Sequence, residues 1–160
     1  MSTDELADRL GYLFKHAHAR LTELTVEALR PHGITGRELA VLIVLDGPGS
    51  ASQQEAAGRL GVDRTTMVSF VDTLEARGLV TRWPDATDRR RNVVVLTDAG
   101  KHTLRQARKA GEEAERRFLA PLTPAAADQF RRALRDLVIG PTADPSPGEA
   151  RPAPSTVDPG

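Results

Sequence analysis

Apolar residues recur every three or four positions between residues 4 and about 29, which places them along one side of a helix. This spacing predicts a long amphipathic helix. Pro31 and Gly33 end it, because both residues interrupt helical backbone. An almost wholly apolar run, residues 39–45, follows. It predicts a second helix that must be largely buried, since it has no polar side to expose.

Capping signals mark the starts of the helices. Thr35 and Glu38 precede the buried run, and Ser52 and Glu55 follow it with the same three-residue spacing. This is the spacing of a capping box, in which the two residues satisfy each other's backbone N–H groups at a helix start. A short helix is therefore expected to begin after Ser52 and to end at Gly61.

The next helix is predicted to have two distinct sides. Asp63 is placed to cap it. Its apolar stripe consists of Met67, Phe70, Val71 and Leu74. Off the stripe lie Arg64, Thr65, Ser69, Asp72 and Ala76. The exposed start of this helix is therefore small, polar and basic.

Two strand-like runs, residues 79–83 and 91–97, are joined by the turn-rich segment PDATD and predict a β-hairpin with a long tip. Thr97 then starts a long helix with a seam of mostly small side chains at seven-residue spacing, which allows a second helix to approach closely. The seam consists of Leu104, Ala107, Gly111, Ala114 and Phe118. Thr123 and Pro124 begin a last helix, which carries Phe130, Leu134, Leu137 and Val138.

Composition narrows the class of protein. The 160 residues are 39% apolar, which is enough for the core of one ordinary domain. With 22 basic and 22 acidic side chains the net charge is zero, so a nucleic-acid footprint has to be local. Such a patch exists between residues 64 and 109, where ten basic residues stand against five acidic ones.

Several kinds of site and location are disfavoured. Cysteine is absent, which excludes disulfides, thiol catalysis and thiolate metal sites. We expect a cytoplasmic protein without a membrane partner, because the chain has no apolar run of about 18 residues and no secretory segment. Residues 140–160 consist mainly of Pro, Ala, Ser and Gly without apolar periodicity, so we expect a disordered tail after a folded part that ends near Ile139.

The order of elements indicates a winged helix-turn-helix. A short helix, the tight turn LGV and a second helix make a helix-turn-helix, whose second helix enters the major groove of DNA. A helical hairpin that only completes a core has a similar sequence, but the hairpin that follows favours the winged form. Arg89, Arg90 and Arg91 at its tip suit a narrow minor groove. The alternative is that they form a charged edge that prevents aggregation.

Residues 60–100 resemble the MarR family of winged-helix transcriptional regulators. The family pattern LE..GL..R...D.DRR...V.LT..G is met by Leu74, Glu75, Gly78, Leu79, Arg82, Asp85, Asp88, Arg89, Arg90, Leu96, Thr97 and Gly100. The helix order extends the resemblance over about residues 4–139. The fold class expected is mainly α with a small β-hairpin wing, in which a winged helix-turn-helix domain is joined to a helical dimerisation region.

The resemblance implies a homodimer that binds a pseudo-palindromic operator in double-stranded DNA and usually represses nearby genes. One MarR-type domain would span residues 1–139, with a DNA-binding part at about 35–97. Dimerisation helices at about 4–30 and 98–139 would carry apolar surface that one small domain cannot cover, and the two-fold symmetry of the dimer would match the operator.

The resemblance also implies which residues contact DNA. It places Arg64, Thr65, Thr66 and Ser69 on the recognition helix, makes Arg90 the wing arginine and lets Asp88 hold it. Arg89 and Arg91 would face phosphate or solvent, and Ser52 is a further expected contact. Two positions depart from family usage: Ser69 often carries a larger side chain, and Trp83 lies where polar residues are frequent.

A small phenolic or anionic effector is a further implication of the family, bound between the first two helices and the wing domain. Tyr12 and His16 lie four apart on one helical face with Arg20 next along it, so they could form the polar part of such a pocket. An exposed face or a dimer contact explains them equally well. No metal site is expected, because His16 and His18 point to different faces.

No cofactor and no enzymatic activity are expected. The sequence has no glycine-rich phosphate loop, nucleophile elbow or HExxH motif. The remaining alternative is a winged-helix module that binds another protein and does not bind DNA. It predicts association that is insensitive to salt.

Overall fold

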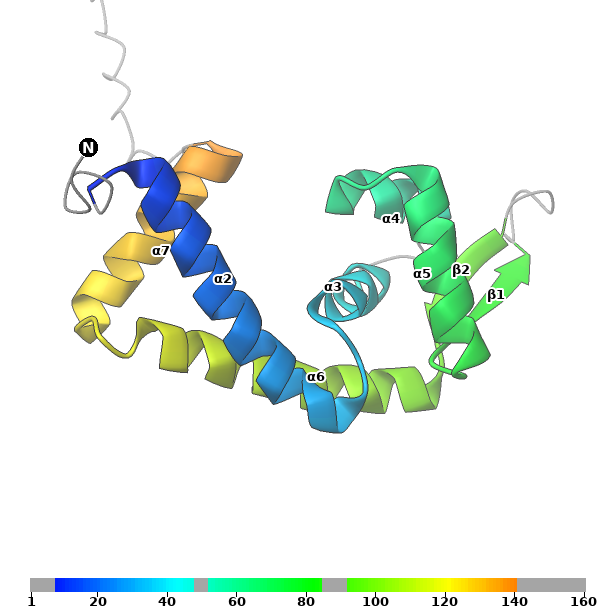
Figure 1. Ribbon diagram of the computed structural model, residues 1–160. Helices are drawn as coiled ribbons and strands as arrows, with labels where there is room; N and C mark the ends of the chain where they lie inside the picture. Colours follow the sequence, from blue (N-terminus) through cyan, green and yellow to red (C-terminus); the bar gives the residue numbers. More distant parts are fainter. Residues whose placement is uncertain (1–7, 48–51, 85–91, 141–160) are drawn as a thin grey trace, which may run out of the picture. The chain divides into compact units, whose positions relative to one another are not determined.

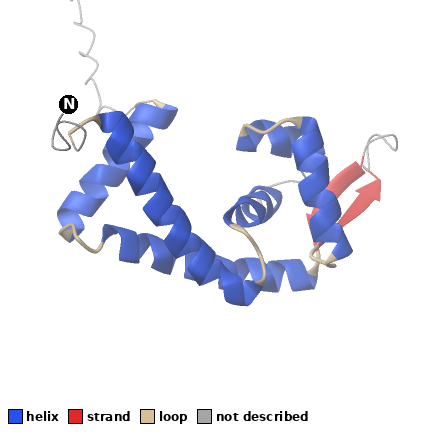
Figure 2. Cartoon of the chain, in the orientation of Figure 1, coloured by secondary structure: helices blue, strands red, loops and turns tan. Residues whose placement is uncertain are grey.

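The computed structural model describes residues 8–47, 52–84 and 92–140 (Figure 1). The elements are α2 (Leu10–Leu29), the 3-10 turn η1 (Arg30–His32), α3 (Gly36–Leu45), α4 (Gln53–Leu60), α5 (Arg64–Ala76), β1 (Val80–Pro84), β2 (Asn92–Leu96), α6 (Asp98–Leu119) and α7 (Pro124–Ile139). Figure 2 shows the predicted fold class, mostly helix with one two-stranded hairpin. The chain divides into two compact units, one ending at Pro121 and one beginning at Leu122 that contains α7.

The predicted helix caps are confirmed. Thr35 and Glu38 form a capping box at the start of α3, and Ser52 and Glu55 form one at the start of α4. The side chains of Asp63, Thr97 and Thr123 each accept a backbone N–H three residues on, at the starts of α5, α6 and α7. Each cap satisfies a backbone N–H group that has no partner inside its helix.

Helix α2 starts later than the helix that the sequence predicts. Residues 1–7 lie outside the described part, but Asp8 and Arg9 are described and are not helical, so the prediction of one helix from residue 4 was wrong there. Arg9 has extended backbone and no capping side chain. Leu10, Leu13 and Phe14, which follow, are 71%, 47% and 48% exposed. The apolar spacing therefore marks one face of a helix without fixing the residue at which the helix begins.

The core lies among α3, α4, α5, the hairpin and the first part of α6. Its largest fully buried side chains include Leu42, Met67, Leu74, Val94 and Leu104. Helix α3 is largely buried, as predicted, although Ile43 is exposed. The predicted close approach along the small-residue seam of α6 is also confirmed: Ala107 and Ala114 are fully buried, and α6 packs against both α2 and α3.

The strands β1 and β2 pair antiparallel, with Val80 opposite Leu96 and Trp83 opposite Val93. Val80, Val94 and Leu96 belong to the core, so one face of the hairpin anchors it to the helices. Trp83 is 59% exposed, and because side chains alternate along a strand it lies on the face of β1 opposite to Val80. Among the described helices, none combines the length and apolarity that a membrane crossing needs.

Candidate nucleic-acid interface

The turn between α4 and α5 is tight. Gly61 has a left-handed backbone with φ 64°, which suits glycine, and the amide of Val62 donates to the carbonyl of Ala57 at 3.1 Å. Ala56 and Ala57 are buried, so no bulky side chain separates the two helices. This arrangement is the predicted helix-turn-helix, with α5 as its second helix.

The two sides of α5 differ as the sequence predicts. Met67, Val71 and Leu74 are fully buried, which fixes the inner side of the helix in the core. Of the expected DNA contacts, Arg64, Thr65 and Ser69 are exposed, whereas Thr66 is half-buried. The first turns of α5 therefore expose polar and basic side chains, while the opposite side of the helix is held in the core.

Thr66 is tied to the cap of its own helix. Its hydroxyl donates to Asp63 Oδ2 at 2.6 Å, and its amide donates to Asp63 Oδ1 at 2.9 Å. These two bonds hold the pKa of the Asp63 carboxyl below its ordinary value, and the bond from the Thr66 hydroxyl has the larger effect. Thr66 has therefore already used its donor proton, and its hydroxyl could meet DNA only as an acceptor.

Arg82 of β1 pairs with the acidic residues of α5, a connection that the sequence did not reveal. Its guanidinium contacts both Asp72 and Glu75, and its amide donates to Glu75 at 3.2 Å. Arg82 is therefore more than one charge in a basic patch. Its single positive charge offsets part of the negative charge of two carboxylates that would repel phosphate, and it links the wing to α5.

The wing also joins α6 through a close backbone contact. The hydroxyl of Thr97 donates to the carbonyl of Gly78 at 2.7 Å, and its amide donates to the carbonyl of Leu79 at 3.1 Å. A Cβ atom on Gly100 would lie 1.9 Å from that Leu79 oxygen. Only glycine fits there, which gives a physical reason for the Leu-Thr-x-x-Gly part of the sequence pattern.

Ser52, one of the expected DNA contacts, lies inside the fold. Ser52 is 7% exposed, its hydroxyl donates to Glu55 at 2.7 Å, and its backbone bridges to Val93 of β2. Its contact with DNA stays a prediction. The other expected wing contacts, Asp88, Arg89, Arg90 and Arg91, lie outside the described residues.

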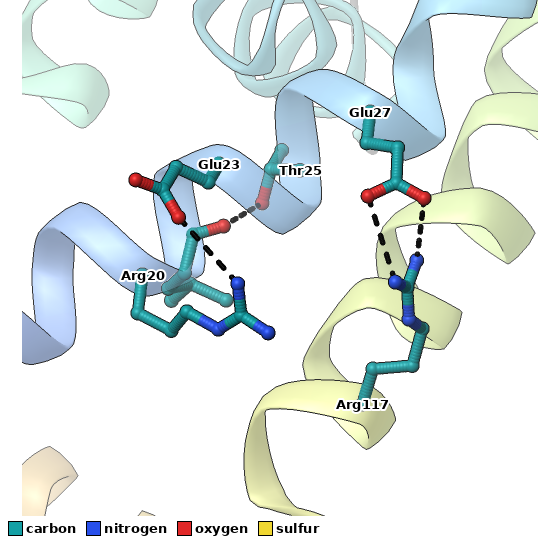
Figure 3. Close-up of polar contacts among 6 residues, drawn as sticks. Arg20, Glu23, Thr25, Glu27 and Arg117 are labelled. Atoms are coloured by element: carbon teal, nitrogen blue, oxygen red, sulfur yellow. Dashed lines mark hydrogen bonds and ion pairs between the residues drawn. The ribbon is translucent and has the colours of Figure 1, made fainter.

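The candidate ligand residues all lie exposed on α2. The rings of Tyr12 and His16 are 4.1 Å apart between centroids and tilted by 45°. Arg20 instead lies against Glu23, at 3.5 Å (Figure 3). Of the three candidate ligand residues, the structure thus brings together Tyr12 and His16. Within the described part of the chain, no group of His, Asp and Glu residues could hold a metal ion.

Comparison with known proteins gives consistent matches. A model described as MarR family matches residues 32–91. The repressor NicR of Pseudomonas putida is 31% identical over 100 residues, 62% of this chain but only 63% of NicR, just under two thirds of its length. A putative transcriptional regulatory protein for the hcr operon of Thauera aromatica is 33% identical over 117 residues, 73% of this chain and 68% of that protein.

Solved structures match over most of the chain. The repressor CouR bound to a 23-mer DNA duplex has a TM-score of 0.80 and 33% identity, and the match covers 86% of this chain and 97% of CouR. CouR bound to p-coumaroyl-CoA has a TM-score of 0.75 and 31% identity, and covers 86% of this chain and 96% of that one.

Proposed function

The chain belongs to the MarR family of transcriptional regulators, and we propose that it is a homodimeric repressor that binds a pseudo-palindromic DNA operator and is released by a small-molecule ligand. The observation that carries the proposal is α5, whose inner side is locked in the core while Arg64, Thr65 and Ser69 are exposed at its outer side. A helix held in this way can enter the major groove without rearranging.

The charges around α5 support DNA as the partner. Asp72 and Glu75 share Arg82 as a partner, so half of their negative charge is compensated within the protein. Arg64 remains exposed at the first turn, where a guanidinium can reach phosphate or the edge of a guanine. In addition, CouR, 33% identical, has been solved on a DNA duplex.

Exposed apolar side chains support the homodimer. Leu137, Val138 and Ile139 at the end of α7 are 78%, 75% and 77% exposed, and within this helix no residue is buried. Leu10 and Phe14 are similarly open on α2. Such apolar surface is unfavourable in water, and a second copy of the chain would cover it. We therefore assign dimerisation to about residues 4–30 and 98–139, and DNA binding to about 35–97.

A phenolic or anionic ligand is the class of effector that we propose. CouR, 31% identical, has been solved with p-coumaroyl-CoA, whose name denotes a phenolic acyl group on an anionic carrier. Tyr12 and His16 offer an aromatic face and hydrogen-bonding atoms in one place on α2. A ligand carboxylate or phosphate would have to compete with Glu23 for Arg20.

Binding to the DNA that flanks its own gene tests the function most directly. We expect a gel shift at low salt, with an affinity that falls steeply as salt is raised, since phosphate contacts release counterions. Arg64→Ala should weaken binding by roughly 1 to 3 kcal/mol if Arg64 reads a base. Arg37→Ala, which removes an exposed arginine on α3, is the matched control.

Three results would argue against the proposal. No retention of flanking DNA at low salt would favour the alternative, a module that binds another protein. Equal effects of Arg64→Ala and Arg37→Ala would remove Arg64 from the interface. A monomer in sedimentation velocity at micromolar concentration would exclude the dimer.

A further inference from the structure

Arg77 ties the C-terminal end of α5 to the corner between α2 and α3. It is the residue directly after the helix, and its side chain reaches back across the fold. Nη1 donates to Glu38 Oε1 at 3.1 Å, and Nη2 donates to the carbonyl of Gly33 at 2.5 Å. One guanidinium therefore joins the recognition helix to residues 44 and 39 positions earlier in the chain.

The two acceptors of Arg77 are themselves fixed. Glu38 is 7% exposed, and its other oxygen accepts the amide of Thr35 at 2.7 Å as part of the capping box of α3. Gly33 has a left-handed backbone at the end of η1, which sets the direction of its carbonyl. A buried carboxylate needs its partners, because an unpaired charge in this position is costly. Arg77 is thus bound to a rigid anchor.

A second contact holds the same end of α5. Gly78 and Leu79, which follow Arg77, accept hydrogen bonds from Thr97 at the start of α6. The opposite end of the helix, with Arg64, is exposed. A helix of 13 residues is about 20 Å long. A tilt of about 5° at the held end would therefore move the other end by about 2 Å, which is more than a hydrogen bond tolerates.

We propose that Arg77 is a positioning residue for operator recognition, and that it sets the angle of α5 by clamping its C-terminal end to Glu38 and Gly33. This inference rests on the proposed function. Arg77 itself need not touch DNA, because it acts through the orientation of the exposed residues at the start of α5. Loss of the clamp should affect contacts that depend on angle, namely those with base edges, more than the long-range attraction to phosphates.

The decisive experiment compares two DNA duplexes of equal length, one taken from the flank of the gene and one with the same bases scrambled. Arg77→Met keeps the length of the side chain and removes the hydrogen bonds. Affinity for the flanking duplex should fall about tenfold, whereas affinity for the scrambled duplex should fall less than about twofold. Arg37→Met is the matched control, because Arg37 is exposed next to Glu38 and its side chain makes no hydrogen bond or ion pair with another described residue.

A variant of the acceptor Glu38 tests whether its contact with Arg77 accounts for the loss of affinity. Thr35 and Arg77 donate to different oxygens of Glu38. Glu38→Gln turns one of those acceptors into an NH2 donor, so one of the two contacts is lost. It should reproduce the loss for the flanking duplex, and the double variant should be no weaker than the weaker-binding single variant. Hydrogen exchange without DNA provides a separate readout: the amides of Gly78 and Leu79, which bond to Glu75 and Leu74, should exchange faster in Arg77→Met.

The possible failures can be told apart. If the wild-type protein does not prefer the flanking duplex, the proposed function fails, and the role of Arg77 fails with it. If the wild type prefers it and Arg77→Met keeps the same preference, only the role of Arg77 is refuted. Equal losses on both duplexes would show a general loss of folded protein and would also refute it. Additive effects of Arg77→Met and Glu38→Gln would exclude a shared clamp.

Discussion

Helices α5 and α7 both carry an apolar stripe, but their environments are opposite. In α5, Met67 and Leu74 are fully buried among α3, the hairpin and α6. In α7, Leu137 and Val138 are 78% and 75% exposed. An amphipathic pattern shows which side of a helix avoids water, and it does not show whether that side is covered by the same chain or by another one.

This difference separates two parts of the protein by what they need in order to be stable. The described residues from α3 to β2 satisfy their helix caps and bury most of their apolar side chains within one chain. The first half of α2 and all of α7 leave apolar side chains open. The first part is covered within its own chain, together with residues of α2 and α6, and the second leaves the apolar surface that the proposed dimer would cover.

The largest effect is expected from a single methyl group at the joint between the hairpin and α6. In Gly100→Ala the new Cβ would lie 1.9 Å from the carbonyl oxygen of Leu79, so the backbone has to move. We expect a loss of more than about 4 kcal/mol in the free energy of unfolding, or no folded protein. Urea unfolding followed by circular dichroism measures it.

Gly58→Ala is the matched control for this change. Gly58 lies within α4, and nothing lies within 4 Å of the position that its Cβ would take. Alanine favours helix over glycine, so this variant should gain about 0.5 to 1 kcal/mol. A similar loss in both variants would mean that close packing at Gly100 is not the cause.

Two leucine substitutions test the contrast between α5 and α7 directly. Leu74→Ala removes a fully buried side chain and should cost about 2 to 5 kcal/mol in urea unfolding. Leu137→Ala should change the unfolding of the single chain by less than about 0.5 kcal/mol. It should instead raise the dissociation constant of the dimer, measured by sedimentation velocity over a dilution series. A large loss of stability without any change in association would place Leu137 in a core of its own chain.

The smallest effect is expected from the ion pair between α2 and α6. Glu27 and Arg117 pair at 3.1 Å on the surface, with side chains 58% and 45% exposed (Figure 3). A double-mutant cycle with alanine should give a coupling of about 0.2 to 1 kcal/mol that decreases with salt. The pair within one helix, Arg20 with Glu23, provides a local reference. A coupling above about 2 kcal/mol would mean that the pair is shielded from water.

The features that the sequence predicted correctly are local ones. The capping boxes of Thr35 with Glu38 and of Ser52 with Glu55 each join residues three apart, so one turn of chain contains all that they need. The left-handed turn at Gly61 depends on one residue. The resemblance to the MarR family pattern added the prediction of the wing, and together with the local signals it led to the correct fold class.

The sequence was less informative where distant residues meet. Helix α2 starts at Leu10, whereas the apolar spacing continues through Asp8 and Arg9 without a break, so the spacing does not indicate where the helix begins. Arg82 was counted as one charge of a basic patch, yet it contacts Asp72 and Glu75. The clamp from Arg77 to Glu38 spans 39 positions, and nothing in the spacing of the two residues indicates it.

The sequence by itself therefore determined the order of the helices, their caps, the hairpin and the polar outer side of α5, because these depend on interactions within a few residues. Tertiary structure alone decided which charges are paired and which apolar stripes are covered. Those outcomes depend on distances between segments far apart in the chain, and on water being excluded from the core around α5 while it still reaches the apolar residues of α7.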